Sequence, residues 1–592
     1  MTPEAAHHDC DVLIAGSGAG GLAAAVAARE LGLEVLVVEK ACTIGGTTAW
    51  SGGELWVPAN RWQQAAGVMD TTEAAAAYLD EAAGGRGPAE LRATFTRHAA
   101  RAVEKLVELG AMAVEPMFDA PDYEMQLAGA CPGGRTLRTV PFDGRELGAE
   151  FVRLRDPLAA GQILGGLSMA REDLPHFRGL LRSPRSAAHV ARLVTTHGWQ
   201  RLGGLHRGAR TTMGNALIAR LVAWLMARNV PIWTAAALRT LETLGTTVSG
   251  GVVETLKGTV RVRARHGVIL ATGGFSHDQD MMVRHYPHVA DGQSHLPLPP
   301  PEVKGDGLRL AQALGGALGG QVIQPSAWTV VSRYPVPSGA TFLVPHFGDR
   351  SKPGIIAVLA NGSRFANEAA DYHVFCAHLI KACAGEREAQ AWLIADDSAL
   401  RSYGLGRVGA FPFPLGPALR SGYLIRGRSS SELALAAGIS PQGLERSLER
   451  WNQMAGSGRD TDYGKGENYF DRSSGDASHH PNPCVAPITR PPFYAIRIQP
   501  GNLSTFLGLA IDGSSRVLDH TGRPLPGLYA VGADAESIAG GAYPAAGITL
   551  GPAVTFGVLA AEKIAGKTLS TNIAPSGAVR RAPDAATLIN PA

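Results

Sequence analysis

The chain has 592 residues, of which 45% are hydrophobic and 18% are charged, and its formal net charge is +3. This length exceeds one simple core, so we expect two or more domains, and the composition excludes an intrinsically disordered chain. The small net charge argues against a nucleic-acid partner. The six cysteines form no CxxC pair, which argues against a zinc ribbon, a c-type haem or thioredoxin chemistry.

The same numbers predict a location. Scattered cysteines favour a reducing compartment. No apolar leader precedes the first predicted strand, and no uncharged apolar run reaches the length of a membrane-spanning helix. We therefore expect a cytoplasmic protein, and we expect no metal site.

Residues 11–39 predict a strand, a glycine turn, an alanine-rich helix and a second strand, which together form a dinucleotide-binding unit. Gly16 permits the tight turn, Gly18 allows the backbone to approach a pyrophosphate, and Gly21 lets the helix pack closely on the strand. The helix N-terminus presents free N–H groups to the phosphates. Glu39 ends the second strand, at the position of an acid that holds ribose hydroxyls.

The patterning predicts further elements in chain order. They are a glycine- and threonine-rich loop at 40–60, helices at 73–110 and 213–228, strands within 248–265, and a buried strand over 267–271. A proline-rich stretch at 290–305, short strands at 325–425, helices at 430–455, a loop at 456–485, a strand at 527–532 and a helix at 552–565 follow.

Residues 178–210 are basic. Seven arginines in this stretch meet only Glu172 and Asp173 nearby. A solvated helix face explains such a pattern, and so does a surface that contacts a partner or a membrane. Both interpretations stay open on the sequence.

Four glycine-rich stretches, within about residues 9–566, resemble the fumarate-reductase-like flavoprotein superfamily: Gly16–Gly21, Gly45–Gly53, Ala271–Phe275 and Gly527–Gly532. Further stretches resemble, within that superfamily, the FAD-dependent 3-ketosteroid dehydrogenases: Asn361–Glu368 with Tyr372, Pro492–Ala495 and Ala542–Gly557. The resemblance implies an α/β fold, in which a Rossmann-like FAD-binding domain with a parallel sheet is split by an inserted α+β domain that caps the substrate. The boundaries that we expect are 9–278 and 494–567 for the FAD-binding domain, 279–493 for the inserted catalytic domain, and 568–592 for a disordered tail.

The resemblance implies FAD bound without a covalent link. The residues that we expect to hold it are Gly16, Ser17, Gly18, Ala19, Gly20, Gly21, Glu39, Lys40, Gly46, Thr47, Thr48, Ser51, Gly52, Gly53, Ala271, Thr272, Gly273, Gly532, Asp534, Gly547 and Leu550.

The implied activity introduces a C=C bond next to a ring ketone, as in 1,2-desaturation of a 3-ketosteroid. A base removes the α proton, and a hydride passes from the β carbon to flavin N5. We expect the Tyr543 hydroxyl and the Gly547 backbone N–H to polarise the ketone oxygen, as in an oxyanion hole. Tyr372 matches the base position of the family. Free tyrosine has a pKa near 10, so Tyr372 needs a lowered pKa or a partner, for which Tyr123 is the candidate.

The chain departs from the family at two points, and alternatives follow. It has Tyr543-Pro-Ala-Ala-Gly547 where the family often has Tyr-Pro-Gly-Pro-Gly, and Glu-Met-Gln-Leu after Tyr123 where His-Pro-Glu is usual. The substrate therefore stays open between a 3-ketosteroid, a 5α-steroid desaturated at the 4 position and a smaller cyclic ketone. A fumarate or enoate reductase and a non-catalytic flavin-binding protein are the remaining readings. The partners that we expect are a ketosteroid-like substrate and an electron acceptor such as a quinone or an electron-transfer protein; peripheral membrane contact stays open.

Several side chains have two interpretations. Arg364 either binds a carboxylate or braces the domain interface through Glu368, and we favour the second. His373 either assists the base or points elsewhere. Four aromatic residues either form an apolar wall for a flat substrate or pack in the core: Trp50, Trp56, Trp328 and Phe506.

Overall fold

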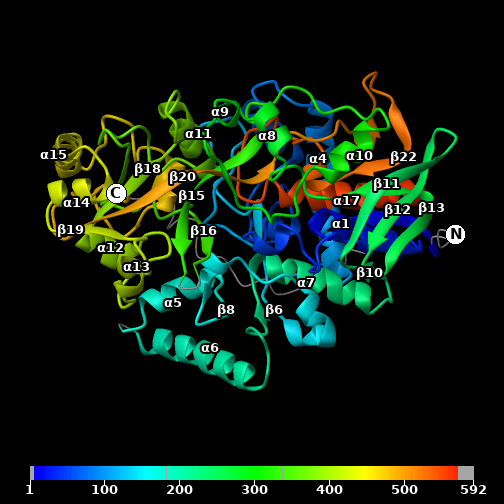
Figure 1. The fold of residues 1–592 in the computed structure, drawn as a ribbon, viewed down its shortest axis with the longest axis horizontal. Coiled ribbons are helices and arrows are strands. Elements are labelled where there is room, and N and C mark those ends of the chain that lie inside the picture. Colours follow the sequence, from blue (N-terminus) through cyan, green and yellow to red (C-terminus); the bar gives the residue numbers. More distant parts are fainter. Residues whose placement is uncertain (1–5, 182, 337–338, 571–592) are drawn as a thin grey trace.

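The computed structural model describes residues 6–181, 183–336 and 339–570. Two large sheets organise these residues, and Figure 1 shows them side by side along the long axis. The predicted tail lies outside the described residues from 571 onward.

The first sheet has eight strands, in the order β10-β2-β1-β13-β12-β11, with β22 on β13 and β21 on β22. Pairing is parallel from β10 through β2 and β1 to β13 and from β13 to β22, and antiparallel through β11, β12 and β13. The strands are β1 (Ala6–Ala15), β2 (Val35–Val38), β10 (Ile232–Trp233), β11 (Ala236–Leu244), β12 (Thr247–Thr255), β13 (Gly258–Leu270), β21 (Arg516–Leu518) and β22 (Pro524–Ala530). The predicted parallel sheet of an α/β fold is thus confirmed.

The second sheet has seven strands and is mostly antiparallel, in the order β16-β15-β20-β18-β17, with β14 and β19 also on β20. Its strands are β14 (Leu296–Pro297), β15 (Ser326–Pro335), β16 (Thr341–Pro345), β17 (Ile355–Val358), β18 (Ala391–Asp396), β19 (Ile425–Gly427) and β20 (Phe493–Thr505). Residues 494–505, which the sequence analysis assigned to the FAD-binding part, therefore form the central strand of this sheet.

Smaller sheets and the helices complete the fold. The short strands are β3 (Glu54–Trp56), β4 (Val114–Pro116), β5 (Thr136–Thr139), β6 (Phe142–Asp143), β7 (Gln162–Ile163), β8 (Leu167–Ser168) and β9 (Arg210–Thr211). The helices are α1 (Ala19–Glu30), α2 (Arg61–Ala65), α3 (Thr72–Ala82), α4 (Ala89–Glu108), α5 (Leu174–Arg178), α6 (Pro184–Leu202), α7 (Met213–Met226), α8 (Gln279–His285), α9 (Pro287–Ala290), α10 (Asp306–Gln312), α11 (Tyr372–Ala382), α12 (Asp397–Tyr403), α13 (Gly416–Arg420), α14 (Ser430–Ala437), α15 (Pro441–Ser457), α16 (Tyr469–Ser474) and α17 (Leu550–Ala565).

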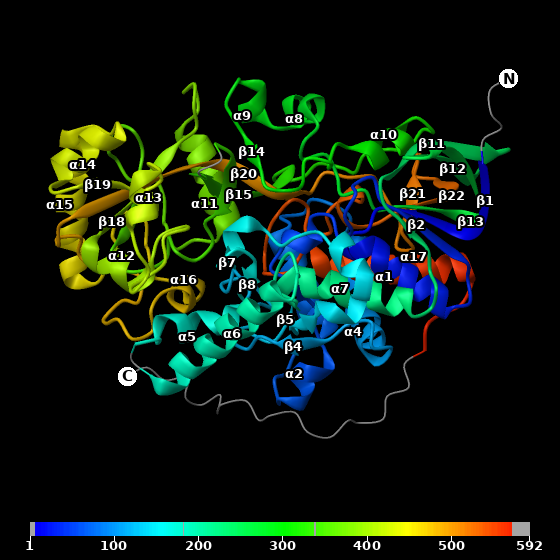
Figure 2. The same ribbon diagram turned by 60° about the horizontal axis from the view of Figure 1, so that its bottom comes forward.

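Small residues let the helices pack closely on the first sheet. Figure 2 shows α1, α7 and α17 together on one face of it. The ten residues from Ala19 to Ala28 are all buried. A Cβ at Gly557 of α17 would lie 2.5 Å from the carbonyl oxygen of Gly20, so only glycine permits this crossing. The alanine-rich sequence of α1 therefore serves close packing as well as helix formation.

Two elements differ from the sequence prediction. The strands predicted separately around 258–265 and 267–271 are one strand, β13, because a bulge opposite Cys10 and Val12 absorbs the irregularity and Gly267 adopts φ +143°. The region 325–425 contains helices α11, α12 and α13 besides short strands. Helix α11 is hard to see in the sequence because it is buried on several sides and lacks a clear polar stripe.

Candidate functional site

A cavity of about 970 Å³ opens along the carboxyl ends of β1, β2, β13 and β22 and extends to the second sheet. This volume lies at the upper end of the range for ligand sites and suits two ligands end to end. The carboxyl edge of a parallel sheet is also where α/β folds bind their ligands. All but three of the expected cofactor residues line the cavity, the exceptions being Gly53, Asp534 and Gly547.

The first glycine turn fits a bound phosphate group. Gly16 has φ +117°, and a Cβ there would lie 2.0 Å from the carbonyl oxygen of Ala271. Gly18 is different, because a Cβ there would meet only Thr48 Oγ1 at 3.6 Å. The backbone at Gly18 is thus open to the cavity at the N-terminus of α1, where N–H groups lack helical partners.

Glu39, which follows β2, both fixes the glycine turn at Ser17 and faces the cavity. The Glu39 carboxylate accepts hydrogen bonds from Ser17 N (3.0 Å), Ser17 Oγ (2.6 Å) and Ala41 N (2.8 Å). It is buried and also lines the cavity. Next to it, Lys40 forms an ion pair with Asp306, so β2 and α10 are joined at the cavity wall.

Asp534 and Gly53 do not line the cavity, but they hold loops that do. The Asp534 carboxylate accepts hydrogen bonds from Thr272 N (2.5 Å), Thr272 Oγ1 (3.0 Å) and Gly274 N (2.9 Å), which fixes the glycine turn after β13. A Cβ at Gly53 would lie 2.3 Å from the carbonyl carbon of Met213, which shows how closely this loop packs on α7. The residues present therefore fit a dinucleotide along this half of the cavity.

Three tyrosines far apart in the sequence meet at the other half. The ring centroids of Tyr372 and Tyr543 are 5.0 Å apart, those of Tyr123 and Tyr372 are 6.0 Å apart, and those of Tyr123 and Tyr543 are 6.1 Å apart. All three line the cavity. Thr549 lines the same cavity.

Burial controls the ionisation of this tyrosine cluster. It raises the pKa of Tyr543 to about 12, although the neighbouring Tyr372 and Thr549 hydroxyls oppose the shift. It raises the pKa of Tyr372 and of Tyr123 well above 10. Each tyrosine is therefore a neutral phenol at neutral pH, and the lowered pKa that the sequence analysis considered for Tyr372 is not present.

The loop from Tyr543 to Gly547 is anchored on its carbonyl side. The Pro544 carbonyl accepts from Tyr123 N and from the Tyr78 hydroxyl, both at 2.7 Å. The Ala546 carbonyl accepts from Thr136 Oγ1 (3.0 Å), and the Gly547 carbonyl accepts from Trp56 N (3.1 Å). Within the described residues, the Gly547 N–H has no acceptor. Gly547 is not itself part of the cavity surface, but its neighbours Ala546 and Ile548 are.

A buried ion cluster beneath this loop positions Tyr123, and the sequence analysis missed it. Arg135 binds Asp122 (2.7 Å) and Asp70 (2.6 Å), and Asp122 also accepts from Trp56 Nε1 at 2.8 Å. Asp122 precedes Tyr123 in the chain, so the cluster fixes the backbone at the tyrosine. The run Gly133-Gly-Arg135 was visible in the sequence, but no local pattern linked it to acids 13 and 65 residues away.

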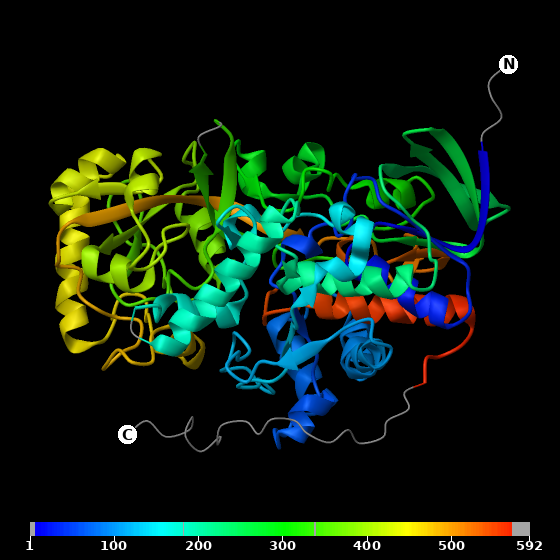
Figure 3. The same cartoon turned by 90° about the horizontal axis from the view of Figure 1, so that it is seen from below.

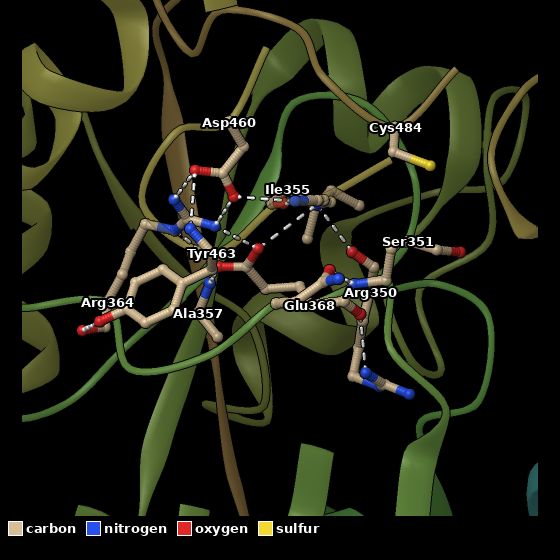
Figure 4. Close-up of polar contacts among 12 residues, drawn as sticks. Arg350, Ser351, Ile355, Ala357, Arg364, Glu368, Asp460, Tyr463 and Cys484 are labelled. Atoms are coloured by element: carbon tan, nitrogen blue, oxygen red, sulfur yellow. Dashed lines mark hydrogen bonds and ion pairs between the residues drawn. The ribbon is translucent and has the colours of Figure 1, made fainter. Parts of the chain in front are cut away.

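A second buried cluster holds the segment that leads to Tyr372. Figure 4 shows Arg364 between Glu368 and Asp460, and the guanidinium binds each carboxylate through two hydrogen bonds of 2.8 to 3.0 Å. Burial opposes ionisation of Glu368, but Arg364 and Lys465 hold its pKa below the ordinary value. The predicted pairing of Arg364 with Glu368 is thus present. It lies among residues of the second-sheet region, rather than between that region and the first sheet.

Tyr372 is the first residue of α11. Asp371 caps this helix by accepting from His373 N (2.9 Å) and Val374 N (3.0 Å), and burial raises the pKa of Asp371 to about 7. Arg350 donates to the carbonyls of Glu368 (2.7 Å) and Ala370. The position of the Tyr372 ring therefore depends on Arg364, which the sequence analysis paired with Glu368, and on Arg350, which no motif indicated.

The remaining aromatic candidates divide between cavity and core. Trp50 and Phe506 line the cavity, whereas Trp56 and Trp328 are fully buried in the core. His373 accepts a hydrogen bond from Trp328 N at 3.0 Å, and burial lowers its pKa to about 4. It is thus a neutral structural histidine that does not line the cavity.

Arg155 is a further cavity residue that the sequence analysis missed. It lies over the ring of Trp50 and pairs with Glu302 at 3.3 Å. Its buried Nε has no partner among the described residues. A buried guanidinium with an unmet donor at the wall of the cavity suits an anionic ligand group there.

Comparisons with known proteins agree with this geometry. The pattern of the family described as "FAD binding domain" matches residues 11–550. The chain is 36% identical to 4-oxocyclohex-2-ene-1-carboxylate 5-dehydrogenase of Sinomonas cyclohexanicum, over 94% of each chain. It is 33% identical to 3-oxosteroid 1-dehydrogenase of Mycolicibacterium smegmatis, over 94% of this chain and 97% of the relative. The crystal structure of 3-ketosteroid delta1-dehydrogenase from Sterolibacterium denitrificans, in complex with 1,4-androstadiene-3,17-dione, superposes with a TM-score of 0.86 at 35% identity and covers 94% of this chain and 99% of that one.

Proposed function

The chain belongs to the FAD binding domain family and is an FAD-dependent oxidoreductase acting on CH–CH groups, and from that premise we propose that it desaturates a ring ketone next to its carbonyl, as in 1,2-desaturation of a 3-ketosteroid. The observation that supports this most is the tyrosine cluster, in which Tyr123, Tyr372 and Tyr543 share one cavity with the glycine loops. The two remaining interpretations, a fumarate or enoate reductase and a non-catalytic flavin-binding protein, have no such support.

Tyr543 and Gly547 polarise the ketone oxygen in this proposal. A phenol has one proton to donate and two lone pairs. The neighbouring Tyr372 and Thr549 hydroxyls oppose the rise in the pKa of Tyr543, as donors to its oxygen would, and we assign the Tyr543 proton to the substrate. The Gly547 N–H is the second donor, and it has no competing acceptor among described residues. Donors fixed in advance at a developing oxyanion lower the barrier to losing the α proton.

Tyr372 takes the α proton. Because burial raises its pKa, a phenolate at this position requires a hydrogen-bond donor, and Tyr123, whose ring centroid lies 6.0 Å from that of Tyr372, is the candidate. Tyr123 is held by the buried Arg135–Asp122 pair and by its own N–H bond to the Pro544 carbonyl. The geometry therefore supports the partner role that the sequence analysis gave Tyr123.

The glycine turn at Gly16 to Gly21, Glu39, and the loops at Gly46 to Gly52 and Ala271 to Gly273 would hold FAD. When bound, FAD supplies the acceptor for the hydride that leaves the β carbon. Turnover then requires an electron acceptor such as a quinone or an electron-transfer protein. We propose no covalent link to the flavin.

Two classes of ring ketone are candidates for the substrate. Apolar side chains, Leu298, Leu503 and Phe506 among them, line the cavity and suit a flat steroid. The second candidate is an oxocyclohexane or oxocyclohexene carboxylate, which the Sinomonas relative favours. Arg178 is exposed and lines the same cavity, so it could bind such a carboxylate.

A substrate panel tests the proposal. The holoenzyme is mixed anaerobically with a saturated-ring 3-ketosteroid, with 4-oxocyclohexane carboxylate, and, in a separate arm, with fumarate and a reduced dye. We expect a ring ketone to bleach the flavin and Tyr372→Phe to lose bleaching while it still binds the ketone. Bleaching by neither ketone, or an unchanged rate in Tyr372→Phe, would contradict the proposal.

A further inference from the structure

Helices α5 and α6 stand apart from the two large sheets. Figure 1 places α6 at the lower edge of the molecule, and Figure 3, seen from that side, shows it toward the viewer. One face of α6 packs on a small apolar cluster, in which Val190 and Leu193 meet Leu167 and Phe177. Its opposite face has no partner within the described chain.

The unpartnered face is both basic and apolar. We call it the outer face of α6, and it comprises Arg185, Ala188, Arg192, Thr195, Trp199 and Leu202. These six residues follow the spacing of three and four that places side chains on one face of a helix, and all are exposed. Trp199 is 75% exposed and Leu202 is 82% exposed, whereas the other eight tryptophans of the chain are buried or half-buried.

Further exposed apolar side chains lie beside this face. Leu181, between the two helices, is 67% exposed. Leu164, at the tip of the β7–β8 turn, is 62% exposed, and its carbonyl lies 3.0 Å from His197 Nε2 of α6. Exposed apolar side chains gathered in one place usually mark a site of interaction.

The charge around this face has one sign. The sequence has no acidic residue between Asp173 and Glu242. Asp173 itself is buried and is already bound by His189 (2.9 Å) and Arg210 (2.7 Å). Arg185 and Arg192 therefore project from the outer face without a compensating carboxylate on the helix.

We propose that the outer face of α6 docks on the surface of a membrane that contains anionic phospholipids. A helix with arginines among exposed tryptophan and leucine lies in the plane of the interface, with the apolar side chains among the acyl chains and the cations at the headgroups. Tryptophan favours this depth because its ring is amphipathic. No helix in residues 6–570 that the structure describes is long and apolar enough to cross a bilayer, so the contact is peripheral.

Charge favours a membrane over a second copy of the chain. Twofold docking through the outer face would place the arginines of both copies in one interface without a carboxylate from either outer face, at an energetic cost. An anionic bilayer instead neutralises them and receives Trp199 and Leu202.

The docked face lies next to the cavity. Leu174, Pro175 and Arg178 of α5 line the cavity, and α5 packs against α6 through Phe177. Docking would thus place the cavity wall near the lipid, from which an apolar ketone could enter. Entry of the ketone from the lipid rests on the proposed function, whereas docking does not. The experiment below measures membrane binding alone and needs no enzymatic turnover.

The experiment measures sedimentation of the holoenzyme with vesicles. One set contains phosphatidylcholine alone, and the other contains phosphatidylglycerol and phosphatidylcholine in equal parts. We expect binding to the anionic set only, and release by salt. Arg185→Gln with Arg192→Gln should lower partitioning about 30-fold, because each basic residue near an anionic surface contributes a factor of about five. Trp199→Ala should lower it about tenfold or more.

Matched controls lie on another face. Leu435→Ala with Arg446→Gln removes one exposed apolar and one exposed basic side chain from α14 and α15, and should bind vesicles as the wild type does. Flavin content and the melting temperature verify that each variant is folded. The proposal is overturned if the wild type does not bind anionic vesicles at low salt, or if the α6 variants bind them as strongly as the control variant does. A concentration-dependent dimer that Trp199→Ala abolishes, without vesicle binding, would assign the face to a second copy, and salt-sensitive capture of an acidic electron carrier alone would assign it to that partner.

Discussion

Gly18 offers a substitution that should change cofactor binding without changing the fold. Its φ is −74°, which every residue adopts. An added Cβ would meet only Thr48 Oγ1, at the ordinary contact distance of 3.6 Å. Gly18 also lines the cavity at the N-terminus of α1. In Gly18→Ala, the methyl group therefore occupies space that only a ligand would otherwise use.

The size of the effect follows from the hydrogen bonds that a displaced phosphate loses. A hydrogen bond to a charged group contributes about 1.5–3 kcal/mol. If the methyl group moves the phosphate away from two backbone N–H groups, about 3–6 kcal/mol is lost, which corresponds to FAD binding about 10²- to 10⁴-fold weaker. The stability of the apoprotein should stay within about 0.5 kcal/mol of the wild type.

The assay is titration of apoprotein with FAD, followed by the quenching of flavin fluorescence, beside thermal unfolding of the apoprotein. Two glycines serve as controls. Gly32 has φ +93° and nothing within 4 Å of a Cβ, so Gly32→Ala should cost about 1–2 kcal/mol of stability and leave FAD affinity unchanged. Gly16→Ala places a Cβ 2.0 Å from the Ala271 carbonyl oxygen and should lose both stability and FAD. If Gly18→Ala binds FAD as tightly as the wild type, the cofactor does not approach residue 18.

Three other predictions follow from the tyrosine cluster, the buried ions and the buried histidines. Tyr543→Phe should lower kcat by about 10²- to 10³-fold with FAD retained, because one oxyanion donor is lost; near-full activity in steady-state assays would remove Tyr543 from the mechanism. Arg364→Met should lower the free energy of unfolding by about 3–5 kcal/mol, because it leaves Asp460 buried without its ion-pair partner and Glu368 with only Lys465, 3.8 Å away. Arg138→Met, which breaks an exposed pair with Glu115, should cost less than about 1 kcal/mol, and equal urea midpoints for the two variants would refute this reasoning. Each of two buried histidines should lower stability as the pH drops from neutral to about 5, because burial lowers the pKa of His288 and His373 from 6.5 to about 4, so the unfolded chain binds more protons at these positions. Burial raises the pKa of Asp371 and of Glu536 to about 7, which acts in the opposite direction, so the histidine contribution is measured as a difference between variants. Between pH 7 and 5 the free energy of unfolding of His288→Gln should fall by about 2 kcal/mol less than that of the wild type, and an equal change in both would contradict the reasoning.

Local chemistry was enough to predict the dinucleotide-binding unit. Its turn, helix and strands lie within residues 6–39, and the spacing of Gly16, Gly18 and Gly21 within that segment was enough to indicate their roles. The same holds for helix α15, which begins after the capping residue Ser440 as its Ser-Pro sequence indicates. The close contact of Gly16 with the Ala271 carbonyl, by contrast, is visible only in the tertiary structure. Periodicity failed at β13, where a bulge at Gly267 joins two predicted strands, and at α11, where burial removed the polar stripe.

The three tyrosines were predicted from a family resemblance, because no pattern in the chain itself relates residues 123, 372 and 543. Their meeting depends on how the second sheet is placed beside the first, and many distant contacts determine this. The sequence analysis missed three buried arginines for the same reason: Arg135, Arg350 and Arg155. An arginine is expected to be exposed, and only the tertiary structure shows that each of these is buried. The ionisation of the cluster was also decided there, since burial, which the sequence does not reveal, raises the pKa of all three tyrosines.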